Sequence, residues 1–124
     1  MFTEEKLYDT LGELLFVVAM ADGIIQEEET KALENLLKGH LHEENIKWSF
    51  NYEVSKNTDI EELYKKVIIT CKKIGPSPIY TEFISSMKII AEAANGTEKS
   101  EEKIINCFSK ELIEKFKNDI ENIK

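Results

Sequence analysis

The residues with the greatest capacity for chemistry lie in two acidic turns. The stretch AMADGIIQEEE, residues 19–29, ends an apolar run at an Asp-Gly pair and then brings three glutamates in a row. The stretch EAANGTEKSEE, residues 92–102, repeats this layout with an Asn-Gly pair. Carboxylates alone favour calcium, magnesium or manganese over zinc. The candidate metal ligands are Asp22, Glu28, Glu29, Glu101 and Glu102.

The first turn has part of an EF-hand pattern. Asp22, Gly23 and Glu29 fall where that loop has a ligand, its required glycine and its bidentate glutamate. The first two ligand positions of the loop are Val18 and Met20, which carry no oxygen ligand, so a standard EF-hand is excluded. A looser oxygen site stays open, because side chains in the first turn of a helix lean back toward its N-terminus and toward Asp22.

A purely structural interpretation explains the same residues. Acidic side chains in the first turn of a helix gain about 0.3 to 1 kcal/mol each from the helix dipole. Glu29 or Glu102 can cap its own helix, and Asp-Gly and Asn-Gly are ordinary turn dipeptides. The second turn is the weaker metal candidate, because Asn95 brings no charge. The residues alone leave both interpretations open.

Helical periodicity dominates the 124 residues, which suit one domain. We expect an all-α fold of five to six helices, with two helix-turn-helix hairpins related by a weak internal duplication. Gly12 lies within the apolar stripe of the first helix. A glycine at such a position lowers the stability of the helix by about 1 kcal/mol relative to alanine, so its presence predicts a close crossing with another helix. The predicted segments are hairpin one over 3–39, a connector over 40–57, helix three over 58–75 and hairpin two over 77–123.

The connector carries the one pattern that is not helical. Residues 46–54 alternate apolar and polar side chains, as a half-buried strand does, but no second strand exists for pairing. We therefore expect an irregular or partly helical segment whose Trp48, Phe50 and Tyr52 pack onto the helices. Thr58 is expected to open helix three as a capping box with Glu61.

Charge argues against nucleic acid as a partner. The net charge is −8, and all 16 basic residues are lysine, so the guanidinium fork used to bind phosphate and guanine is missing. The acidic N-terminus is unlike a signal peptide, and the longest apolar run, residues 14–21, is too short to cross a bilayer. These features predict a cytoplasmic protein without a transmembrane segment.

No pattern of catalytic residues is present, so we expect a protein that is not an enzyme. Cys71 and Cys107 fall on apolar helix faces and are predicted to be buried thiols. His40 and His42 lie beside a helix end with no third partner in sequence, so we expect surface or capping roles for them.

The stretch AMADGIIQEEETKALENLL, with its echo AEAANGTEKSEEKIINCF, resembles the tellurite-resistance TerB-like family, which is also found as a domain of DnaJ-like co-chaperones. The resemblance implies an internally duplicated helical domain with a metal site at its acidic turns. It also implies a role in metal or stress response, often beside membrane-associated protein partners. Asn95 departs from the aspartate of the family, so a symmetric second site does not follow. The residues that match the family's turns are Asp22, Glu28 and Glu29 in the first and Glu101 and Glu102 in the second.

The alternative function is a helical protein-interaction module in which both acidic turns are purely structural. Exposed aromatic side chains between Trp48 and Tyr52 would favour this alternative.

Overall fold

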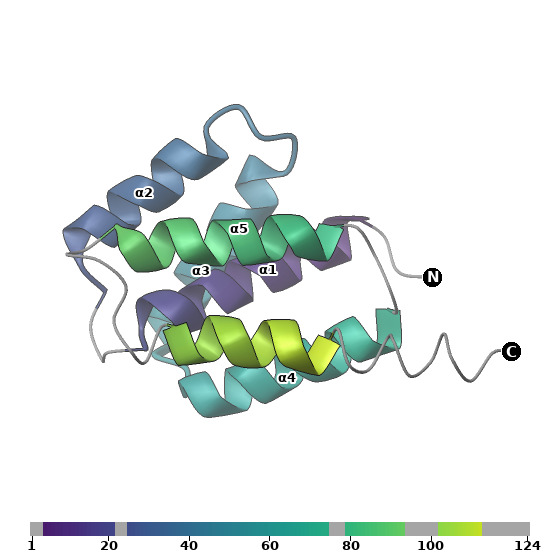
Figure 1. Cartoon of the computed structure of the whole chain (residues 1–124). Coiled ribbons are helices and arrows are strands. Elements are labelled where there is room, and N and C mark those ends of the chain that lie inside the picture. Colours follow the sequence, from purple (N-terminus) through teal and green to yellow (C-terminus); the bar gives the residue numbers. More distant parts are fainter. Residues whose placement is uncertain (1–3, 22–24, 75–78, 94–101, 113–124) are drawn as a thin grey trace, which may run out of the picture.

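Helix α1 is the centre of the fold and packs against α3, α4 and α5 (Figure 1). The computed structural model describes residues 4–21, 25–74, 79–93 and 102–112, which contain six helices and no strand. This confirms the all-α prediction, whereas the predicted internal duplication is not shown. The helices are α1 Glu4–Ala19, α2 Glu27–Leu37, α3 Glu43–Lys56, α4 Ile60–Ile74, α5 Ile79–Glu92 and a last helix over residues 102–112.

The sequence of α1 explains its central place. Its residues from Leu14 to Ala19 are all buried, so its apolar surface runs around the helix and not along a single stripe. A helix that is apolar on all sides must be covered on all sides. In α1, three neighbouring helices provide that cover, while α2 packs on α5.

The predicted close crossing at Gly12 is confirmed. A Cβ atom added to Gly12 would lie 2.5 Å from the carbonyl oxygen of Ile46 and 2.7 Å from the Cβ of Ser49. Both atoms belong to α3, so the backbones of α1 and α3 meet at this point with no space for a side chain on α1.

The expected connector contains a regular helix, α3, and the expected packing of Trp48 and Tyr52 is wrong. Both aromatic side chains are exposed, and of the three aromatic residues only Phe50 is buried. The buried face of α3 follows helical spacing, but two of its members are polar, which conceals the helical period in the sequence. The buried residues are Ile46, Ser49, Phe50 and Glu53.

The start of α4 also differs from the prediction. Asp59, and not Thr58, caps the helix, because its Oδ1 accepts the backbone N–H of Glu61 at 2.8 Å. The Thr58 hydroxyl instead donates to the carboxylate of the buried Glu53 at 3.2 Å. The polar side chain of Glu53 can therefore lie on the inner face of α3, since it has a hydrogen-bond donor there.

Among the residues that the structure describes, no helix is long and apolar enough to span a membrane.

Candidate functional site

The acidic turns are only partly covered by the described residues. Asp22 and Glu101 lie outside them, so their positions relative to the other candidate ligands are not compared. Glu28 is exposed on α2, and Glu102 is exposed at the start of the last helix. Glu29 is only 2% exposed, and its Oε1 accepts the backbone N–H of Gln26 at 3.0 Å. The structural interpretation of Glu29 as a helix cap is thereby confirmed.

Glu28 and Glu29 are adjacent, and their side chains have different environments. One side chain is in solvent, and the other is folded back on the N-terminus of α2. No group of three or more His, Cys, Asp or Glu side chains within the described ranges is placed to hold a metal ion. Because Asp22 and Glu101 are outside those ranges, the metal site remains a prediction.

A titration of metal-stripped protein tests that site. At one hundred times its dissociation constant, calcium, magnesium or manganese is expected to raise the free energy of unfolding by about 2.7 kcal/mol. Asp22→Asn should abolish this gain. Glu29→Ala is a poor control, because it removes the helix cap whether or not a metal binds. Absence of any gain at millimolar metal would refute the metal prediction.

His40 has the third partner that its sequence neighbourhood lacks. Its Nε2 lies 2.6 Å from Oε1 of Glu82 on α5. The hydroxyl of Tyr8 on α1 donates to Oε2 of the same carboxylate at 2.7 Å. The ring of Tyr8 also stacks on His42, with centroids 4.3 Å apart. This cluster ties the segment between α2 and α3 to both α1 and α5.

The hydrogen bonds of His40 fix its tautomer. The backbone N–H of His42 donates to Nδ1 of His40 at 2.9 Å, so Nδ1 carries the lone pair and Nε2 carries the hydrogen donated to Glu82. Both ring nitrogens are therefore occupied within the protein. Sequence reasoning missed Glu82 because it lies 42 residues from His40, and no local spacing connects them.

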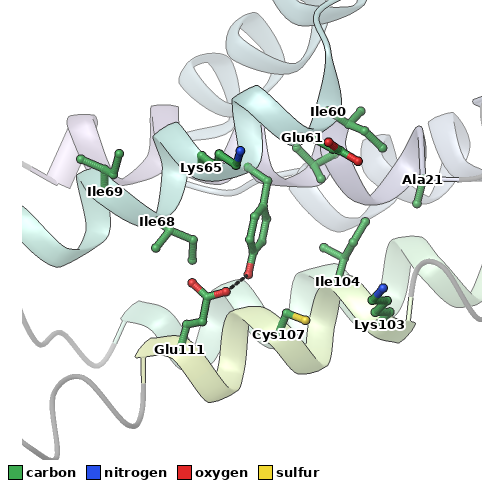
Figure 2. Close-up of a pocket in the computed structure, with 12 residues that line it drawn as sticks. Ala21, Ile60, Glu61, Lys65, Ile68, Ile69, Lys103, Ile104, Cys107 and Glu111 are labelled. Atoms are coloured by element: carbon green, nitrogen blue, oxygen red, sulfur yellow. Dashed lines mark hydrogen bonds between the residues drawn. The ribbon is translucent and has the colours of Figure 1, made fainter.

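A cleft of about 620 Å³ lies between α4 and the last helix, beside the C-terminal end of α1. Figure 2 shows Ile60 and Ile68 of α4 pointing toward Ile104 and Cys107 of the last helix. The volume and the mainly apolar lining, with a few polar groups, are typical of ligand sites in proteins.

Tyr64 of α4 also lines this cleft. Its hydroxyl donates to Oε1 of Glu111 across the gap at 3.5 Å, which is a long and weak hydrogen bond. Burial raises the pKa of Tyr64 well above its usual value, and the nearby Glu111 carboxylate raises it further. The phenol therefore stays protonated and keeps a hydrogen to donate.

The two cysteines have different environments. Cys71 is fully buried, as predicted, and burial raises the pKa of its thiol to about 12. Cys107 is only half-buried and lines the cleft, so the prediction of a buried thiol is wrong for this residue. Cys107 thus provides a chemical probe of the cleft, while Cys71 is an inert internal control.

The second candidate surface is an aromatic pair on the outer side of α3. Trp48 is 66% exposed and Tyr52 is 44% exposed. Their rings stack one helical turn apart, with centroids separated by 5.1 Å and planes inclined by 13°. The ammonium of Lys56 lies 5.1 Å from the Tyr52 ring centroid and extends this pair along the helix.

Comparison of the chain with protein-family models, with curated proteins and with solved structures gave no match. The resemblance to the TerB-like family therefore remains a hypothesis that rests on the acidic turns.

Proposed function

We propose that this protein is a non-enzymatic helical protein-interaction module that contacts its partner through Trp48 and Tyr52. The observation that carries this proposal is the exposure of the only tryptophan in the chain as half of a stacked pair. Tryptophan and tyrosine are among the residues that most often supply the binding energy of protein interfaces.

The aromatic pair is also organised in advance of binding. Each ring restricts the rotamers of the other, and Lys56 lies against the Tyr52 face. Side chains that are already ordered lose less conformational entropy when a partner covers them. The fold itself does not need the pair, since the inner face of α3 is formed by other residues.

Two features support a role other than catalysis. His40 has both ring nitrogens engaged by the protein. Glu29, the buried carboxylate of the acidic turn, caps α2. The role in metal or stress response that the TerB-like resemblance implies is a separate prediction, which the metal titration tests.

Trp48→Ala is expected to weaken partner binding by about 2 kcal/mol or more, which is roughly 30-fold in dissociation constant. The variant should keep its stability to within about 0.5 kcal/mol, because the side chain is mainly in solvent. A photo-reactive amino acid in place of the exposed Asn51, three residues from Trp48, would identify the partner in cells by crosslinking. The affinity of the purified partner is then measured against both proteins.

Ile89→Ala is the matched control, since Ile89 is an exposed apolar residue on α5 and not on α3. Its affinity for the partner should change by less than about twofold. The proposal fails if no discrete partner crosslinks from α3, or if the partner binds Trp48→Ala as tightly as the wild type.

A further inference from the structure

The cleft between α4 and the last helix is a separate feature from the aromatic pair. Its residues belong to α1, to the turn at Ala21, to α4 and to the last helix, and none belongs to α3. It also has an apolar edge in solvent, because Ile69 of α4 is 54% exposed. An apolar floor with an exposed apolar edge is typical of a surface that another molecule covers.

The walls of the cleft have the spacing of helix-packing ridges. On α4, residues 60, 64 and 68 form one row at four-residue intervals, and residues 61, 65 and 69 form the next. On the last helix, residues 103, 107 and 111 form the facing row. Such rows are the ridges between which the side chains of another helix pack. The α4 rows extend for about 14 Å, which matches two to three helical turns.

The charges at the rim fit a helix that carries side chains of both signs. Each wall carries one acid and one base, namely Glu61 and Lys65 on α4, and Glu111 and Lys103 on the last helix. Within the described residues, Glu61, Lys65 and Lys103 have no ion pair. A helix with charges of both signs beside its apolar stripe can satisfy both walls.

We infer that this cleft is a docking groove for an amphipathic helix of a partner protein, one whose apolar stripe is flanked by both acidic and basic side chains. The apolar stripe lies on the floor formed by Ile60, Ile68 and Ile104. Tyr64 also lines the groove, and its hydroxyl donates a long hydrogen bond of 3.5 Å to Glu111, which an acceptor on the partner can replace. This inference does not depend on the aromatic pair of α3.

Selection of peptides by the purified full chain tests the inference. One displayed library holds peptides of about 14 residues whose apolar side chains have helical spacing. A second library holds peptides of the same composition whose apolar residues alternate with polar ones, which is the pattern of a strand. Enrichment is expected from the helical library alone, with both lysine and glutamate beside the apolar stripe. The selected peptide, when synthesised, should slow the alkylation of Cys107 by iodoacetamide, while Cys71 stays unreactive throughout.

Ile69→Lys places a charge on the apolar edge and should weaken the peptide by about tenfold or more. Ile89→Lys is the matched control, because Ile89 is 44% exposed but lies on α5 outside the cleft, and it should leave the affinity within about twofold.

Peptides that bind Ile69→Lys as well as wild type would overturn the inference. So would protection of Cys107 by dodecanoate with no helical peptide enriched, since the cleft would then be a small-molecule pocket. Trp48→Ala should not change either readout, which separates this test from that of the aromatic pair.

Discussion

Gly12→Ala is expected to lower the free energy of unfolding by about 3 kcal/mol, the upper end of the usual cost of overpacking a core. The added methyl group would approach the carbonyl oxygen of Ile46 at 2.5 Å, and a backbone atom cannot rotate away as a flexible side chain can. Alanine is a better helix former than glycine by about 1 kcal/mol, but this gain is smaller than the cost of separating α1 from α3. Urea unfolding followed by circular dichroism measures the difference.

Two further variants show whether the crossing is the cause. Gly39→Ala changes a glycine that has no atom near its missing Cβ but has a φ of +79°, so its cost should come from the left-handed backbone alone, at about 1 kcal/mol. Adding Ser49→Gly to Gly12→Ala removes the Cβ that lies 2.7 Å away and should restore part of the loss. A Gly12→Ala protein as stable as wild type would show that α1 and α3 are farther apart than described.

The sequence predicts the helices of this fold well wherever the buried face is made of apolar residues. The first helix is found as α1, and the close crossing predicted from Gly12 in its apolar stripe is found as well. The prediction fails on α3, where the buried Ser49 and Glu53 are polar and the apolar Trp48 and Tyr52 are exposed. A polar residue can be buried where a neighbour accommodates it, as Gly12 does for Ser49 and Thr58 does for Glu53. Polarity alone therefore does not predict which residues of α3 are buried.

The candidate sites depend more strongly on tertiary contacts. The capping role of Glu29 joins residues that are close in the sequence, and it is one of the interpretations that the sequence predicts. The bond between His40 and Glu82 and the cleft between α4 and the last helix each join residues roughly forty positions apart. No spacing in the sequence connects such residues, because their meeting depends on how the helices pack around α1.

The last helix is attached to the fold through Phe108, together with its other buried residues, Ile105 and Leu112. The side chain of Phe108 is fully buried, and its ring lies 6.1 Å from that of Phe83 and 6.5 Å from that of Tyr80, both on α5. Its neighbour Cys107 faces the cleft instead. The helix therefore forms one wall of the cleft with one face and is held in place by the other.

Phe108→Ala is expected to lower the free energy of unfolding by about 3 to 5 kcal/mol, since it leaves a cavity where two aromatic contacts are made. Phe108→Leu keeps most of the volume and should cost less than about 1.5 kcal/mol. Native-state hydrogen exchange then measures where the stability is lost. Faster exchange over residues 102–112 than over α1 would show that the last helix detaches first, and the cleft would open with it. Equal loss of protection in both helices would contradict this, and would mean that the wall of the cleft unfolds only together with the central helix.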